Sequence, residues 1–198
     1  MTMKVVINLI RQETEVKKEK LPEAEVSLRI ALYYIKNKLT DSNVSVSIDG
    51  AHVKTGNQIH FNIQQFMREI GATQIVGEAG KWQGTYSLPD TEIKLLLHSK
   101  PGNGDVIIHL INGKTLLIES KKGGFNSSKG NPEYPLMREA IGQLVTGGPL
   151  IDKVILAVAV PYSEKSYDLA TRWSKYPQIQ MLGIKFLLVN KEGNIIEI

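Results

Sequence analysis

The sequence contains no cysteine among its 198 residues. This absence excludes disulfides, thiolate zinc sites, iron–sulfur ligation and cysteine nucleophiles, and it favours a reducing cytoplasm. No apolar run approaches the ~20 residues that a membrane span needs, and the first residues lack the apolar core and cleavage site of a secretory signal. The four histidines show no metal-ligand spacing. We therefore expect a cytoplasmic protein that has no membrane span and no histidine-dependent chemistry.

The composition is that of a globular protein, with 42% hydrophobic and 22% charged residues. Its length suits one domain with a single core. The net charge of +4 favours a polyanionic partner mildly, although a solvated lysine-rich surface gives the same number. The Gly-rich segments "SKPGNG" and "SKKGGFNSSKG" carry Lys100, Lys122 and Lys129, which we take as candidate DNA contacts.

The N-terminal part predicts a helix and a hairpin. "MKVVINLI" is typical of a strand, and Pro22 with two following acids opens a helix that runs to about Leu39. "VSVSIDGAHVKT" alternates apolar residues before Asp49-Gly50, which is typical of a hairpin turn. A helical face starts near Gln58 and stops at Gly71. We therefore expect an N-terminal extension over residues 1–56 and a core over 57–198.

The core shows an α/β order of elements. "DVIIHLI" and "KTLLIESK" form two strands joined at Asn112-Gly113, and a helix follows over Tyr134–Thr146. "KVILAVAV" is apolar on both faces, which is typical of a central parallel strand. A helix over about Glu164–Tyr176 and two C-terminal strands complete the pattern. This order predicts a mixed β-sheet flanked by helices.

The central hairpin brings possible catalytic groups together. Residues i and i+2 of a strand share a face, so Glu119 and Lys121 point the same way. A two-residue turn would place Asp105 opposite Ser120, on the other face. A three-residue loop with Gly113 as a left-handed bulge places Asp105 opposite Glu119. A shared site therefore requires this second register, with Gly113 at positive φ.

Such a cluster suits a hard cation and a phosphate. Two close carboxylates repel each other unless a cation compensates them. Mg²⁺ binds one or two carboxylates, waters and phosphate oxygens, which Asp105, Glu119 and the Ser120 backbone carbonyl could supply together. Lys121 would bind a phosphate oxygen or hold, and even deprotonate, the attacking water. The cluster thus predicts hydrolysis of phosphodiesters.

The segment "GDVIIHLINGKTLLIESKKG" resembles the PD-(D/E)XK nuclease superfamily, and the resemblance extends over roughly residues 57–190. The family's aspartate matches Asp105, with Gly104 in place of the usual proline, and its Glu-x-Lys matches Glu119 to Lys121. The following helix matches one in which a glutamine often faces the active site, here Gln143. An amide at the border of that helix's apolar stripe is the alternative for Gln143. Arg138 and Glu139 are assigned to solvent.

The resemblance implies a restriction-endonuclease-like fold and a Mg²⁺-dependent DNA endonuclease, most simply of the restriction type and homodimeric, with Mn²⁺ able to substitute and no small-molecule cofactor. A structure-selective Holliday-junction resolvase and a non-cleaving nucleic-acid-binding module are the alternatives. Many relatives carry an acid in the first turn of the core's opening helix. This sequence offers Gln58, His60 and Gln64 there, which argues against a second metal site. Pro89-Asp90 supplies a literal "PD", but Asp105 is preferred because an apolar strand follows it directly.

Overall fold

The structure is a computed structural model that describes residues 20–102, 104–126, 133–147 and 152–198. The strand expected in "MKVVINLI" and the candidate DNA contact Lys129 lie outside these residues. The elements, in chain order, are β1 (Lys20–Leu21), α2 (Glu23–Lys36), β2 (Val44–Ser47), α3 (Gly50–Val53), β3 (Lys54–Thr55), β4 (Gln58–Ile59), α4 (Ile63–Glu69), β5 (Thr73–Gly77), β6 (Gly84–Ser87), β7 (Lys94–His98), β8 (Val106–His109), β9 (Thr115–Ser120), β10 (Gly123–Gly124), α5 (Glu133–Thr146), β11 (Val154–Pro161), α6 (Glu164–Trp173), α7 (Pro177–Leu182), β12 (Lys185–Val189) and β13 (Ile195–Glu197).

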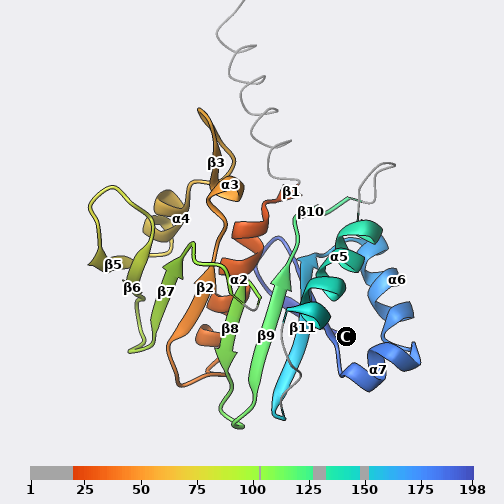
Figure 1. Ribbon diagram of the computed structural model, residues 1–198. Helices are drawn as coiled ribbons and strands as arrows, with labels where there is room; N and C mark the ends of the chain where they lie inside the picture. Colours follow the sequence, from red (N-terminus) through yellow and green to blue (C-terminus); the bar gives the residue numbers. More distant parts are fainter. Residues whose placement is uncertain (1–19, 103, 127–132, 148–151) are drawn as a thin grey trace, which may run out of the picture.

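A nine-stranded mixed sheet forms the centre of the molecule, in the order β13-β12-β11-β9-β8-β2-β7-β6-β5 (Figure 1). β9, β11 and β12 run parallel to one another, whereas β8 is antiparallel to both β9 and β2. β11 is central and almost fully buried, as its apolar sequence predicts. The expected mixed α/β architecture is therefore confirmed. Among the described residues, no helix is both long enough and apolar enough to cross a membrane.

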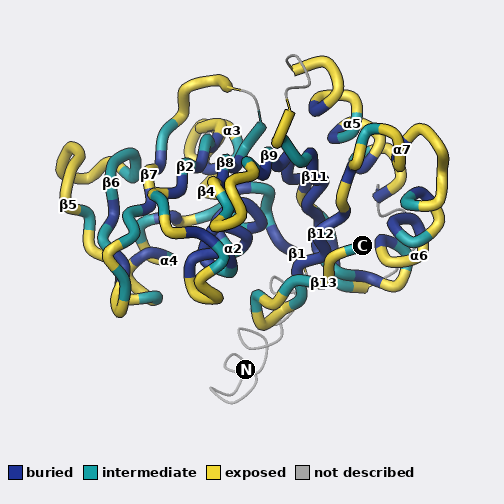
Figure 2. Tube along the Cα trace, turned by 90° about the horizontal axis from the view of Figure 1, so that it is seen from below, coloured by how far each residue is buried: buried dark blue, intermediate teal, exposed yellow. Residues whose placement is uncertain are grey.

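Helices cover both faces of the sheet. α2 packs on β2, β8, β9 and β11 from one side, while α5 packs on β9 and β11 from the other (Figure 2). The alternation of β11 explains both contacts: Ala157 and Ala159 face the α2 side, and Leu156, Val158 and Val160 belong to the core on the α5 side. The small alanines leave room for α2 to approach the sheet closely.

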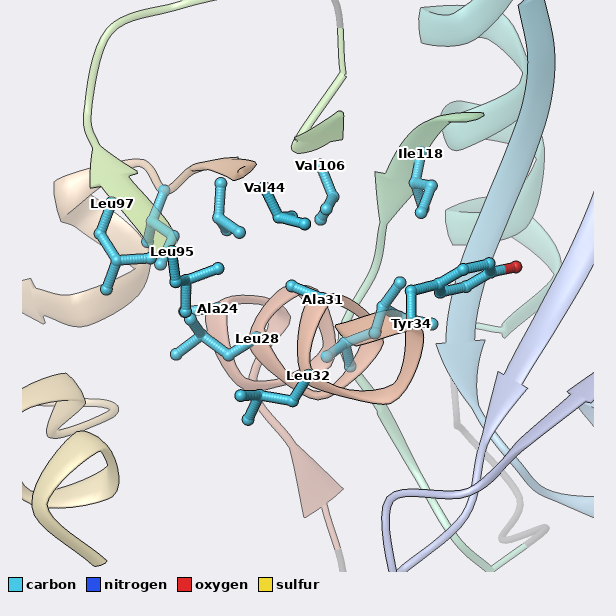
Figure 3. Packing of buried hydrophobic residues seen from close by; sticks show 14 of the residues in the cluster. Ala24, Leu28, Ala31, Leu32, Tyr34, Val44, Leu95, Leu97, Val106 and Ile118 are labelled. Carbon is cyan, nitrogen blue, oxygen red and sulfur yellow. The ribbon is translucent and has the colours of Figure 1, made fainter. Parts of the chain in front are cut away.

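Helix α2 belongs to the core, which differs from the extension expected before residue 57. Nine of its residues are buried, and Leu28 and Ala31 lie in one cluster with Val44, Val106 and Ile118 from three sheet strands (Figure 3). β2 lies between β7 and β8 inside the sheet. The expected boundary at residue 57 differs from the structure because the sequence alone does not show which partner covers the apolar surface of α2 or of β2.

The hairpin expected at Asp49-Gly50 is also corrected. The Asp49 side chain accepts a hydrogen bond from the Ala51 N–H at 2.9 Å and caps the short helix α3. The hairpin occurs seven residues later as β3–β4, where Thr55 pairs with Gln58 and Gly56 takes φ +57°. The next helix, α4, begins at Ile63, where the Asn62 side chain caps it.

Candidate active site

The register of the β8–β9 hairpin is the one that the site requires. Val106 pairs with Ile118 and His109 with Thr115, as the three-residue loop predicts. Gly113 takes φ +78°, and its N–H donates to the Leu110 carbonyl at 2.9 Å. Only glycine adopts this conformation at little cost. The predicted bulge and the predicted register are therefore both confirmed.

Asp105 leaves the strand ladder just before β8 begins. Its N–H donates to the Ile118 carbonyl at 2.7 Å, and its carboxylate accepts from the Ser120 N–H at 2.8 Å. The second bond spans Glu119, so the Asp105 carboxylate is held against the segment that carries the other acid. Asp105 therefore binds β9 through its side chain, instead of forming the regular strand pair with Glu119 that the register predicts.

Gly104 explains why proline is absent before Asp105. Its φ is +82°, which the fixed φ of proline near −65° excludes. A Cβ on Gly104 would also lie 2.9 Å from the Ile118 carbonyl oxygen, which is the acceptor for the Asp105 N–H. The tight approach of Gly104 to β9 therefore sets where Asp105 lies.

Gly104→Ala is expected to lower stability by about 2–4 kcal/mol, because it combines a positive φ with a backbone clash. Gly113→Ala is the matched control: its φ is almost the same at +78°, but nothing lies within 4 Å of the added Cβ. It should cost only about 1–2 kcal/mol. Urea unfolding of both variants measures the difference. Equal losses in the two variants would show that Gly104 does not position Asp105 by close approach.

The buried pair Glu119 and Lys121 lies at the end of β9. Lys121 has 4% and Glu119 has 8% of its surface exposed. The Lys121 Nζ donates to Glu119 Oε1 at 3.1 Å. It also lies 3.3 Å from Glu139 Oε1 and 3.9 Å from Glu23 Oε1. One buried ammonium therefore faces three glutamates, and Asp105 adds a fourth carboxylate beside them.

Sequence reasoning missed Glu23 and Glu139. Glu23 lies in the first turn of α2, which delivers it across the end of β9, and Glu139 reaches Lys121 from α5 although it was assigned to solvent. The available signal for Glu23 was an acid in the first turn of an opening helix. The helical pattern near Gln58 conceals this signal, because it predicts that the core opens there and not at Glu23.

Three carboxylates of the cluster, those of Asp105, Glu119 and Glu23, have raised pKa values and so bind protons more tightly than usual. Burial, followed by the charge of Glu119, raises the pKa of Asp105 to about 7. Burial likewise raises the pKa of Glu119 and of Glu23, against the lowering effect of Lys121. For Lys121, burial lowers the pKa, but the surrounding glutamates outweigh it and the net pKa is raised. Lys121 is therefore an ammonium group, and the cluster carries more negative charge than its lysine can balance.

The remaining predicted site residues differ in whether they contact the acidic cluster. Ser120 is fully buried, and its N–H binds Asp105; its carbonyl as a metal ligand stays a prediction. Lys122 is exposed and follows Lys121 directly, and its backbone hydrogen bonds to Glu23. Lys100 is exposed on the loop after β7. Gln143 lies one turn after Glu139 on α5, exposed, and its amide has no hydrogen-bond partner among the described residues.

The carboxylates of the cluster do not by themselves surround a metal ion. No group of three or more His, Cys, Asp or Glu side chains within the described residues is arranged to hold a metal ion, so an all-protein cage of the zinc or calcium type is not formed there. Mg²⁺ needs only one or two carboxylates and takes its other ligands from water and phosphate. Asp105 and Glu119 are the two carboxylates that could hold such an ion.

Comparison of the chain with protein-family models, with curated protein sequences and with solved structures gives no significant match.

Proposed function

We propose that this protein is a Mg²⁺-dependent DNA endonuclease with a restriction-endonuclease-like core. The observation that carries the proposal is the buried ammonium of Lys121 among four carboxylates at the end of a central strand. Buried charges of one sign are expensive, and such clusters concentrate where a protein binds a counterion or performs chemistry. A cation bound by the acids, together with a phosphodiester, would complete the charge balance.

The order of elements supports the same proposal. The hairpin β8–β9 carries Asp105 before it and Glu119 at its end, α5 follows, and β11 returns parallel to β9. This is the order that the PD-(D/E)XK resemblance implies for residues after Gly104. We assign helix α2, with Glu23 in its first turn, as the counterpart of the family's opening helix, in place of the segment that carries Gln58, His60 and Gln64.

Each side chain has a task in this chemistry. Asp105 and Glu119 would hold Mg²⁺, and Glu23 would bind a second ion or a bound water. The bound Mg²⁺ would polarise the phosphodiester and ease deprotonation of water. Lys121, held protonated by its glutamate neighbours, donates hydrogen bonds and so orients a water or a phosphate oxygen. Gln143 remains a candidate for contact with the substrate from α5.

Incubation of supercoiled plasmid with the protein and Mg²⁺ or Mn²⁺ tests the proposal. Wild type is expected to nick or linearise the plasmid, whereas Glu119→Ala and Lys121→Ala should lose at least about 100-fold in rate. Chelation of the metal should stop wild-type cleavage. If wild type and both variants bind the plasmid and leave it intact, the protein is a non-cleaving nucleic-acid-binding module.

Two further comparisons refine the proposal. Equal cleavage of linear and four-way-branched duplexes favours the restriction type, whereas selective cleavage of branched DNA indicates a Holliday-junction resolvase. The expected homodimer rests on analogy with enzymes that cut two strands. Sedimentation of the protein with and without DNA measures it directly.

A further inference from the structure

Hairpin β3–β4 projects beyond the end of the sheet where β9 ends (Figure 1). All seven residues from Lys54 to His60 are exposed. Their side chains are Lys, Thr, Asn, Gln, Ile and His, with glycine at the turn. No acidic residue occurs from Gly50 to Arg68, although the chain contains 20 acidic residues. The hairpin is therefore a thin polar ribbon without negative charge, next to a cluster of carboxylates.

Two contacts join the segment before this hairpin, residues 47–52, to the acidic cluster. The Ser47 N–H, at the end of β2, donates to the backbone carbonyl of Asp105 at 2.7 Å. Two residues before the hairpin, His52 Nδ1 lies 2.9 Å from Glu23 Oε1. The segment that leads into the hairpin therefore contacts both Asp105 and Glu23.

The base of the hairpin is also anchored in the core. Val53 is buried, and its carbonyl accepts the His60 N–H at 2.9 Å. The Thr55 hydroxyl bonds to the Ala51 carbonyl at 3.2 Å and to His60 Nε2 at 3.0 Å. These hydrogen bonds hold the base of the hairpin together, so its exposed side chains extend from an ordered backbone.

We propose that hairpin β3–β4 enters the major groove of duplex DNA and reads base edges beside the phosphodiester held at the acidic cluster. This inference rests on the proposed nuclease function. The major groove, about 12 Å wide, admits a two-stranded β-ribbon. Asn57 and Gln58 carry the amides that pair with adenine edges, and Lys54 carries the positive charge for a contact with a neighbouring phosphate. Ile59, 60% exposed, offers an apolar contact for a thymine methyl.

Charge around the hairpin favours DNA over a second copy of the chain. Lys54 lies on the ribbon itself, and Lys100 lies beside the end of β2, where its carbonyl accepts the Ser47 hydroxyl at 2.7 Å. Lys122 is bonded through its backbone to Glu23. Lysines beside an acid-free ribbon match a polyanion. Ile59 is the hairpin's one apolar side chain, which is too little for a hydrophobic dimer contact.

The test selects bound duplexes from a library with a randomised segment, using the full chain with Ca²⁺ in place of Mg²⁺, and sequences them. Wild type is expected to enrich specific base pairs. Asn57→Ala/Gln58→Ala should lower the preference at the positions read by about 10- to 100-fold, with non-specific affinity changed by roughly threefold or less. Lys54→Ala should reduce the slope of log affinity against log salt by about 1.

The matched control is Gln178→Ala/Gln180→Ala, which removes two exposed amides from α7, and it should keep the wild-type preference. Lys114→Ala, in the exposed turn at the opposite end of β8–β9, controls for Lys54→Ala. A wild type without sequence preference, or a preference that survives Asn57→Ala/Gln58→Ala, overturns the inference. A change from dimer to monomer in that variant, with preference retained, identifies the hairpin as a contact between copies and also overturns it.

Because selection needs no cleavage, its failure is separate from failure of the nuclease proposal. Plasmid cleavage without hairpin-dependent preference leaves the nuclease standing and removes the groove-reading role. Hairpin-dependent preference without any cleavage in Mg²⁺ or Mn²⁺ supports the groove-reading role and indicates the binding module instead.

Discussion

Asp105→Asn is expected to abolish Mg²⁺-dependent cleavage and, at the same time, to make the metal-free protein more stable at pH 8. Burial and Glu119 raise the pKa of Asp105 to about 7, from an ordinary value of 3.8. Ionisation of Asp105 in the folded protein is therefore costly. Asparagine removes the charge while its side-chain oxygen can still accept the Ser120 N–H that Asp105 binds at 2.8 Å.

The pH dependence of this effect follows from proton linkage. Between pH 4 and pH 7 the unfolded chain has lost the Asp105 proton and the folded chain retains it, so stability falls as pH rises. Above pH 8 the full cost is on the order of 4 kcal/mol, and the expected gain for the variant is on the order of 2–4 kcal/mol. Below pH 4 both states are protonated, and the gain should approach zero.

Urea unfolding in EDTA at several pH values measures the effect, with Asp168→Asn, an exposed acid on α6, as the control. Added Mg²⁺ should stabilise wild type and leave Asp105→Asn unchanged, since metal binding competes with the proton. A variant that is less stable than wild type at pH 8 would contradict the assigned charge imbalance. A variant that cleaves at the wild-type rate would remove Asp105 from the metal site.

Lys121→Met is expected to have the opposite effect on stability and the same effect on activity. Lys121 is 4% exposed, and its ammonium lies 3.1 Å from Glu119 and 3.3 Å from Glu139. Methionine fills a similar volume but leaves the glutamates without their cation. Breaking a buried ion pair by removing one partner costs on the order of 3–5 kcal/mol. Cleavage should fall at least about 100-fold, because no donor then orients the water or phosphate oxygen.

A double variant separates charge from packing. Lys121→Met/Glu119→Gln removes the buried negative charge as well, so it should recover a substantial part of the lost stability without recovering cleavage. Lys114→Met, at the exposed turn, should match wild type in both measurements. If the double variant is as unstable as Lys121→Met, the loss comes from packing instead of uncompensated charge.

The sequence predicts the chemistry of the hairpin better than the outline of the core. Gly113 fixes the loop length, and the period of two then determines which residues of β9 share a face, so register follows from local rules. Local rules of this kind do not predict that Glu23 joins the cluster. Its role depends on where α2 crosses the sheet, which is set by the packing of Leu28 and Ala31 against distant strands.

The same limit applies to Asp49 and Glu139. Asp49-Gly50 satisfies a common hairpin pattern, but the Asp49 side chain caps α3, and tertiary contacts decide between the two uses. Glu139 is half exposed on its helix, so nothing in the periodicity of α5 distinguishes it from a solvated residue. The charges that balance Lys121 come from elements separated along the chain, and only the folded structure brings them together.

The bulge at Gly113 gives the chain an unusual sensitivity to changes of length. Deleting or inserting a single residue in the β8–β9 loop would shift the alternation of the strand, so Glu119 and Lys121 would turn away from Glu139 on α5 and Ile118 would take their place. The acidic cluster would then be lost through a change at the opposite end of the hairpin, although every acidic residue is still present. In related chains, this loop should therefore vary in composition far more freely than in the number of its residues.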